Sequence, residues 1–208
     1  MKKTGFLLTI AALSIAGMMF GCSKAPQQEL SAAKAILDSA AVMEADKYMP
    51  ADFSAAQDSL NAAMVEIEKQ KSANLLARNY DRAKSLILSA SIAARHAQIQ
   101  APEEKRKVKA AVDTLLAQAS AKVGEANALL AKAPKGKEGK AALEAIGNDI
   151  STVKASLADA QALSDKGNLI SARDKANAGI SKLDSIKAEL TTAIEKTSSK
   201  SKSKSKKK

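Results

Sequence analysis

The sequence predicts an all-α protein, an elongated antiparallel helical bundle or a set of coiled-coil hairpins with about six helices. Apolar residues recur at helical spacing almost throughout the chain after residue 29. Aromatic residues make up only 2% of the chain and Trp is absent, so alanine, the best helix former, fills most apolar positions. The four prolines stand where they separate the periodic segments.

The first three predicted helices cover residues 30–47, 51–76 and 80–100. Pro50 disfavours helix at the residue before it and suits the first turn of the next helix. Arg78 and Asn79 are expected to form a tight turn, with Asn79 as the N-cap of the third helix. The predicted buried stripes consist of Leu30, Ala33, Leu37, Ala40, Val42, Phe53, Ala56, Leu60, Met64, Ile67, Tyr80, Ala83, Ile87, Ala90, Ala94 and Ala97.

The fourth predicted helix begins at Pro102, and its first turn holds Glu103 and Glu104, where the helix dipole favours acids. Residues 133–139 are the clearest loop of the chain. The fifth and sixth helices, the sixth ending near Lys196, alternate apolar spacings of three and four, which is typical of a coiled-coil seam. This seam fits an intramolecular hairpin or an intermolecular assembly equally well. A turn as short as residues 165–168 requires the two helices to run antiparallel.

A weak internal repeat divides the helical region in two. The run Asn-Tyr-Asp-Arg-Ala at residues 79–83 matches Asn-Leu-Ile-Ser-Ala at residues 168–172, each at the turn of a predicted hairpin. This indicates two three-helix units, residues 29–101 and 102–196. The alternative is that alanine-rich helices simply look alike.

Residues 31–97 resemble an uncharacterised alanine-rich helical domain family of bacterial envelope lipoproteins. The features that carry the resemblance are Ala33, Ile36, the turn at residues 48–53, Leu60 and the run at residues 79–83. Some members of that family carry a peptidoglycan-binding OmpA-like domain. No such domain is recognised in this sequence, so the resemblance implies no cell-wall binding of that kind.

The first 21 residues have the three regions of a secretory signal, with Lys2 and Lys3 followed by an apolar stretch at residues 6–20 and a small residue, Gly21. The stretch is shorter than the roughly 20 residues that span a bilayer core. The ending Met-Phe-Gly-Cys at residues 19–22 resembles the bacterial lipobox. The resemblance implies cleavage between Gly21 and Cys22, and acyl chains on Cys22.

Cys22 is the only cysteine, so it has no partner for an internal disulfide, and acylation gives it a role. Two or more acyl chains produce stable membrane anchoring. By the same resemblance, Ser23 in place of Asp favours sorting to the outer membrane of the bacterial cell envelope. Residues 22–28 are expected to form a polar tether between the membrane and the helices.

The formal charge of +11 is concentrated at the carboxyl end. Residues 197–208 contain no apolar side chain and are predicted to be disordered. Dense lysine attracts polyanions, and in an exported protein these are anionic envelope polymers and lipid phosphates, with no nucleic acid expected. A solubilising tail without a dedicated partner is the alternative. The predicted polyanion-binding residues are Lys196, Lys200, Lys202, Lys204, Lys206, Lys207 and Lys208.

The terminal Lys208 also resembles the end of Braun-type murein lipoproteins, which are joined to peptidoglycan through a C-terminal lysine. Lys206 and Lys207 depart from that family's ending, and the body of this chain is much larger.

The sequence contains no constellation typical of an enzyme, and we expect no catalytic residues, metal or cofactor. His96 is the only histidine, and an edge or solvated position is expected for it. The acidic residues fall between apolar positions, as on the wet face of amphipathic helices. Three hypotheses follow: a non-enzymatic spacer or adaptor, a helical binding module or regulator of another envelope protein, and an enzyme. The first is preferred because the anchor and the lysines lie at opposite ends of the chain.

Overall fold

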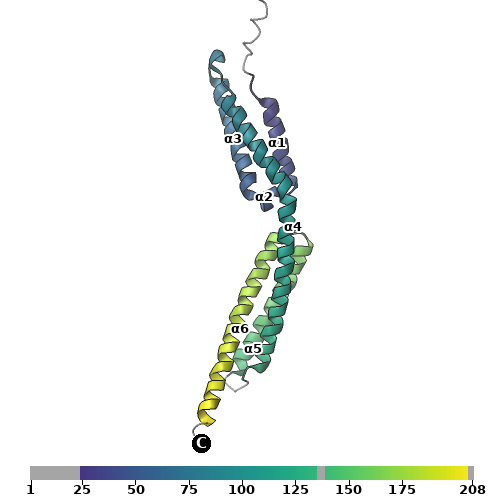
Figure 1. The fold of residues 1–208 in the computed structure, drawn as a ribbon, viewed down its shortest axis with the longest axis vertical. Coiled ribbons are helices and arrows are strands. Elements are labelled where there is room, and N and C mark those ends of the chain that lie inside the picture. The colour runs from purple at the N-terminus through teal and green to yellow at the C-terminus, as the bar shows by residue number, and fades with distance from the viewer. Residues whose placement is uncertain (1–23, 135–138, 206–208) are drawn as a thin grey trace, which may run out of the picture. The chain divides into compact units, whose positions relative to one another are not determined.

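The computed structural model describes residues 24–134 and 139–205, with side chains described as far as Lys196 (Figure 1). All regular structure in these residues is helical, which confirms the predicted all-α class. The elements are α1 (Gln27–Val42), α2 (Ala45–Tyr48), α3 (Pro50–Ser72), the short 3-10 helix η1 (Leu75–Ala77), α4 (Asp81–Lys132), α5 (Lys140–Asp165) and α6 (Leu169–Ser205).

The chain divides into two compact units, with the boundary between Glu103 and Glu104. Unit 1 contains α1, α2, α3, η1 and the first part of α4, and unit 2 contains the rest of α4 with α5 and α6. The sequence repeat placed this boundary after residue 101. Each unit therefore consists mainly of three helical segments, and each has its own core.

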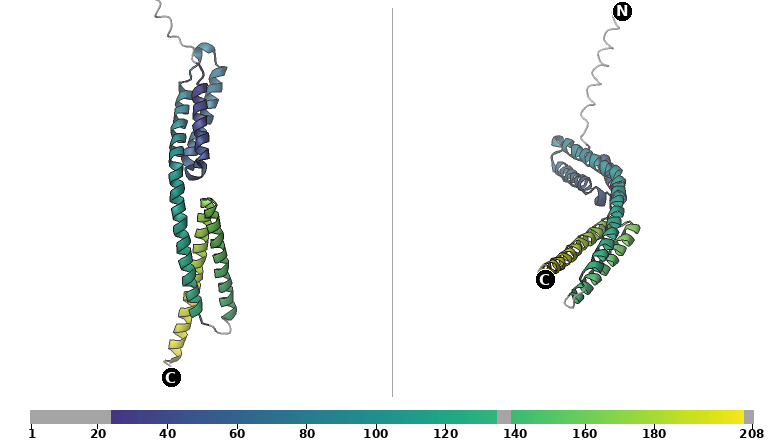
Figure 2. Two further views of the ribbon diagram at one scale, coloured as in Figure 1. Left: turned by 90° about the vertical axis from the view of Figure 1, so that its right-hand side faces the viewer. Right: turned by 60° about the horizontal axis from the view of Figure 1, so that its bottom comes forward.

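In unit 1, α3 runs antiparallel to α1 and to the first part of α4 (Figures 1 and 2). Small residues such as Ala33, Ala63 and Ala90 are fully buried, so the helices approach closely. Larger side chains fill the rest of the core, and Tyr80 is buried at the start of the α4 segment. The unit 1 core consists of Leu30, Ala33, Leu60, Ala63, Ile67, Tyr80, Ala83, Ile87 and Ala90.

In unit 2, residues from α4, α5 and α6 share one core, in which Leu183, Ile186 and Leu190 are almost completely buried. These three positions continue the predicted seam of spacings three and four. The rest of the buried core is contributed by α4 and α5 and consists of Ala119, Ala126, Ala133, Ile150, Val153 and Leu157.

Ion pairs on the surface of unit 2 show the relative directions of its helices. Lys122 pairs with Asp184, and Glu125 pairs with Lys187. The residue numbers of both partners increase in the same direction, so α4 runs parallel to α6. Between α5 and α6 the order reverses. Asp149 lies 2.7 Å from the ammonium group of Lys182, and Asp159 lies 3.3 Å from that of Lys175. The pairs therefore describe an up-down-up bundle, with α5 antiparallel to both neighbours.

The turn between α5 and α6 depends on Gly167, whose φ is 78°. Its N–H donates to the Ser164 carbonyl, and the Asn168 N–H donates to the Leu163 carbonyl, both at 2.9 Å. This is the Schellman arrangement, in which a left-handed glycine satisfies the last carbonyls of a helix. The predicted short antiparallel turn therefore has a defined stereochemical basis.

The buried positions of α4 in unit 1 and of α6 in unit 2 coincide at a fixed offset. Tyr80, Ala83 and Ile87 correspond to Leu169, Ala172 and Ala176, and all six are buried. The register continues along both helices, from Ala94, Ala97 and Ala101 to Leu183, Ile186 and Leu190. The two units thus have the same spacing of buried positions. At the last three pairs alanine in unit 1 corresponds to leucine or isoleucine in unit 2, whereas Ile87 in unit 1 corresponds to Ala176 in unit 2.

The predicted helix boundary at Pro102 is wrong, because α4 continues through this residue. Proline in a helix interior removes one backbone hydrogen bond and costs about 3 kcal/mol. Pro102 is exposed, so its ring displaces no core side chain. The helix is held on both sides of it by buried residues, Ala97 before it and Val112 after it.

The predicted first helix is also interrupted, since α1 ends at Val42 and α2 begins at Ala45. Glu44 between them has a left-handed conformation with φ of 57°. This kink buries Ala45 and Tyr48 and leaves Val42, a predicted core residue, 77% exposed. A left-handed residue other than glycine has no signal in the sequence.

The carboxyl end differs from the prediction of disorder after Lys196, because α6 extends to Ser205. Residues 197–205 contain neither glycine nor proline. Lysine is a good helix former, and extending an existing helix avoids the cost of nucleation. Residues 206–208 lie outside the described residues.

Candidate functional site

The predicted lipidation site, Gly21 and Cys22, lies outside the described residues, which begin at Lys24. Ala25 packs against the unit 1 core, and the Pro26 carbonyl accepts a 3.0 Å hydrogen bond from the Leu30 N–H. α1 begins at Gln27, so the predicted tether over residues 22–28 is too long at its carboxyl end. The helical body therefore starts a few residues after the cysteine.

The connection between α3 and α4 lies at the same end of unit 1 as the start of α1 (Figures 1 and 2). The sequence predicted a helix as far as residue 76, but α3 ends at Ser72. The guanidinium group of Arg78 explains this, because it donates to the carbonyls of Lys71 at 2.8 Å and Ala73 at 3.3 Å. One side chain thereby satisfies carbonyls that are left open at the end of α3.

Three further side chains hold this connection. The Gln70 side-chain carbonyl accepts from the Asn79 N–H at 3.0 Å, and Asn79 Oδ1 accepts from the Asp81 N–H at 2.7 Å. The second bond is an Asx turn that leads into α4. However, α4 begins at Asp81 and the Tyr80 carbonyl accepts the Lys84 N–H at 2.9 Å, so Tyr80 and not Asn79 occupies the predicted N-cap position. Asn74 accepts from the Leu76 N–H at 3.4 Å and begins η1.

Leu75 and Leu76, which form most of η1, are 62% and 96% exposed. They were not singled out in the sequence, where they appeared to end the second helix. Their exposure depends on where α3 stops, and the side chain of Arg78 determines that point. The sequence did contain one signal of this exposure. The two leucines directly follow Asn74, and asparagine favours helix caps and turns.

A second exposed apolar feature is a stripe on the first part of α4. Leu88, Ile92 and Ile99 are 62%, 63% and 64% exposed. Their spacings of four and seven residues place them on one helix face. Arg95 lies between them in sequence and is also exposed.

The lysine-rich segment begins at Lys196, which is exposed in α6. The backbone at positions 200, 202 and 204 is helical, while the side chains of Lys200, Lys202 and Lys204 lie outside the description. Lys206, Lys207 and Lys208 lie outside the described residues altogether. The polyanion-binding site therefore stays a prediction from the sequence.

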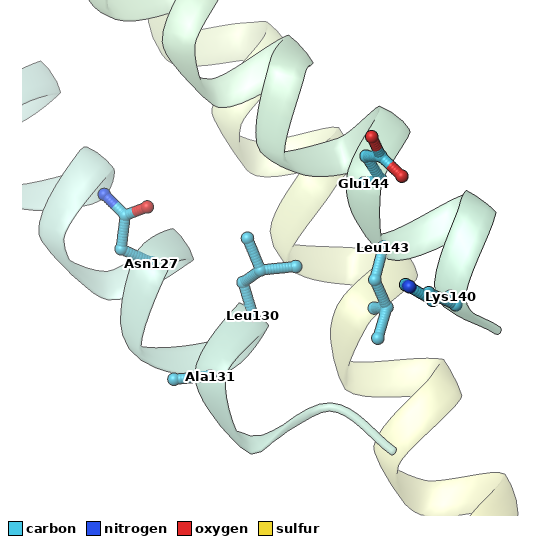
Figure 3. A pocket seen from close by; sticks show the side chains of 6 residues that line it. All are labelled: Asn127, Leu130, Ala131, Lys140, Leu143 and Glu144. Atoms are coloured by element: carbon cyan, nitrogen blue, oxygen red, sulfur yellow. The ribbon is translucent and has the colours of Figure 1, made fainter. Parts of the chain in front are cut away.

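Unit 2 contains an open cavity of about 540 Å³ between the end of α4 and the start of α5 (Figure 3). Leu130 and Leu143 give it an apolar wall, and Lys140 and Glu144 stand at its edge. Asn127 and Ala131 of α4 complete its lining.

His96 lies on the surface, where its Nδ1 is 3.4 Å from a carboxylate oxygen of Asp52. Its side chain is more than half exposed, as expected from the sequence. Within residues 24–134 and 139–205, no group of three or more His, Cys, Asp or Glu side chains is placed to hold a metal ion. Across the same residues, no helix is both long enough and apolar enough to cross a membrane.

No protein-family model matches the chain, and comparison with curated proteins and with solved structures also gives no match. The resemblances to the lipobox and to the alanine-rich envelope family therefore stay predictions.

Proposed function

We propose that the protein is a lipid-anchored protein of the bacterial envelope that acts as a non-enzymatic spacer or adaptor. The observation that carries the proposal is Cys22, the only cysteine, which directly follows a secretory signal ending in Gly21. The compact helical body begins close behind it, because α1 starts at Gln27. Acylation of Cys22 holds such a body at a membrane surface.

The anchor is tested by labelling with an alkyne analogue of palmitate in a Gram-negative host. The wild-type protein and the control Ser23→Ala should take up the label, and Cys22→Ala should not. Label that remains in the Cys22→Ala variant would place the lipid elsewhere. Globomycin, which blocks lipoprotein signal cleavage, should cause accumulation of the wild-type precursor.

Sorting to the outer membrane is the second part of the proposal and rests on Ser23 after the cysteine. Changing Ser23→Asp should move the acylated protein to the inner membrane in a density gradient, whereas Ser23→Ala should leave it in the outer membrane. Equal distribution of the two variants would contradict this sorting.

The lysines at the carboxyl end supply a candidate contact with anionic envelope polymers. Seven lysines without an acidic residue in residues 196–208 favour binding through counterion release, which weakens as salt rises. Removing residues 197–208 should reduce low-salt binding to purified lipopolysaccharide, and changing those lysines to glutamine should do the same. Unchanged binding would assign the segment a solubilising role.

Covalent attachment to peptidoglycan through Lys208 is a separate possibility. It predicts that lysozyme digestion releases the intact protein with peptidoglycan fragments attached, and that a chain lacking Lys208 carries none.

A second candidate function, a helical module that binds another envelope protein, is favoured by the stripe of Leu88, Ile92 and Ile99. These side chains lie on one face of α4 outside the unit 1 core, and aligned apolar anchors on a helix are a common recognition surface. A photo-crosslinking residue in place of Ile92 should give a discrete adduct in intact cells. The same residue in place of Asp58, on α3, is the control, and equal patterns from both sites would argue against this module.

A further inference from the structure

We propose that Leu75 and Leu76 of unit 1 insert into the surface of the membrane that holds the acylated Cys22. This inference rests on the proposed function, since it takes the anchor as given. It adds a second, protein-made contact with lipid, at the boundary between headgroups and acyl chains. The occupant of this apolar surface is therefore a lipid bilayer and not a protein.

The exposure of the two leucines is built into the fold. Leu76 is 96% exposed and Leu75 62% exposed, although the segment around them is ordered by side-chain hydrogen bonds. Arg78 bonds the carbonyls of Lys71 and Ala73, and Asn74 bonds the N–H of Leu76. These bonds keep the leucines at the tip of the connection and pointed away from the core.

The position of the two leucines in unit 1 also favours contact with the membrane. The start of α1 and the connection between α3 and α4 lie at one end of unit 1 (Figures 1 and 2). Ala25 packs on the same core cluster as Ile67 and Tyr80, which flank the connection on either side. Only two peptide links separate Cys22 from Lys24, the first described residue, and they span at most about 7 Å. A lipid on Cys22 therefore holds this end of unit 1 close to the headgroups.

Basic side chains close to the two leucines favour the same contact. Lys69 and Lys71 lie in the last turn of α3, next to the connection, and Lys24 precedes α1. Glu68 pairs with Lys71 at 2.7 Å, so part of this charge is already balanced, while Lys69 is exposed. Basic groups beside an apolar tip suit the surface of anionic phospholipids. The combination of two leucines and nearby lysines favours shallow insertion at the interface.

The test uses the absence of Trp from the chain, which makes an introduced Trp the only such fluorophore. Purified lipidated protein carrying Leu76→Trp is reconstituted into vesicles of phosphatidylethanolamine and phosphatidylglycerol containing brominated acyl chains. Leu88→Trp, at an exposed position on α4, is the matched control. We expect quenching of the Leu76→Trp fluorescence to exceed that of the control at least twofold. Adding Leu75→Ser to Leu76→Trp should reduce the quenching.

Vesicle flotation separates the two ways in which the experiment fails. If the Leu76→Trp protein floats with the vesicles but is quenched no more than the Leu88→Trp protein, the anchor stands and the insertion of Leu75 and Leu76 is overturned. If purified protein carries no lipid and does not float, the proposed function fails and the inference fails with it.

Discussion

Lys122 of α4 pairs with Asp184 of α6, and one turn further along, Glu125 pairs with Lys187 with the signs of the charges reversed. The four groups form one cluster, because the charges of Lys122 and Asp184 also act on the carboxylate of Glu125. A shift of α6 by one turn would place like charges together. The alternation of charges therefore favours this register of the two parallel helices over one shifted by a turn.

Reversing one charge of this cluster should destabilise unit 2, and reversing its partner as well should restore part of the stability. Lys122→Glu and Asp184→Lys each create like-charge contacts, whereas the double variant recreates an opposite pair. The restoration is only partial, because the double variant also sets position 122 against Glu125 and position 184 against Lys187, three residues along the same helix. The expected coupling energy is about 0.5 kcal/mol, in the range of exposed ion pairs. A double-mutant cycle from urea denaturation measures it, and strictly additive effects would argue against the pairing.

The stability of unit 2 should fall in acid partly through Glu125. The hydrogen bond from Lys187, followed by the charge of Lys187, holds the pKa of Glu125 below its ordinary value of 4.5. Because the folded pKa is the lower one, the stabilisation is fully present above the unfolded pKa. It is lost as the pH falls through the folded pKa.

Glu125→Gln should therefore flatten the decrease of the unfolding free energy below about pH 4.5. The control Glu144→Gln, at an exposed position in α5, should retain the slope of the wild-type protein. Identical pH profiles for the two variants, measured by urea denaturation between pH 3 and 7, would contradict the role of Glu125.

The core of unit 2 depends on large side chains of α6. Leu183 is completely buried against α4 and α5, so Leu183→Ala should cost about 2–5 kcal/mol of unfolding free energy. The control Leu88→Ala removes a side chain that is 62% exposed and should change stability by less than about 0.5 kcal/mol. Denaturant unfolding followed by circular dichroism measures both, and similar losses would be inconsistent with the described core.

Gly179 lets α6 approach α5 closely. A Cβ atom at this position would lie 2.9 Å from Leu157 Cδ2 and 3.5 Å from Val153 Cγ1, whereas one at Gly124 would have no neighbour within 4 Å. Gly179→Leu should therefore destabilise the protein by about 1–3 kcal/mol through overpacking. Gly124→Leu should stabilise it by up to about 1 kcal/mol, because leucine is the better helix former. Thermal unfolding should move in opposite directions for the two variants.

The spacing of apolar residues predicted the seams well, because spacings of three and four gather the apolar side chains on a single face of the helix, and that face is then buried. Leu183, Ile186 and Leu190, and in unit 1 Tyr80 and Ala83, are buried as that spacing requires.

The points at which helices end or continue were less predictable, because at each of them the continued helix competes with a local alternative conformation of the backbone. Pro102 lies inside α4, where its exposed position keeps the ring out of the core. Glu44 is left-handed although its side chain gives no sign of it. α3 ends early because Arg78, several residues ahead, reaches back to the carbonyls of Lys71 and Ala73.

The early end of α3 also explains why Leu75 and Leu76 were not singled out in the sequence. Cys22, in contrast, belongs to a short sequence motif that can be recognised without knowledge of the fold. The exposure of Leu75 and Leu76 appears only once α3 has ended at Ser72. On a continued helix the two leucines would have occupied adjacent positions with no reason to project from the tip.

The central claim concerns the chemical state of Cys22, and the intact mass of the mature protein purified from membranes tests it most directly. We expect a chain that begins at Cys22 and carries a diacylglycerol and a further acyl chain. A mature chain with a free thiol at Cys22, or one that begins at another residue, would contradict it.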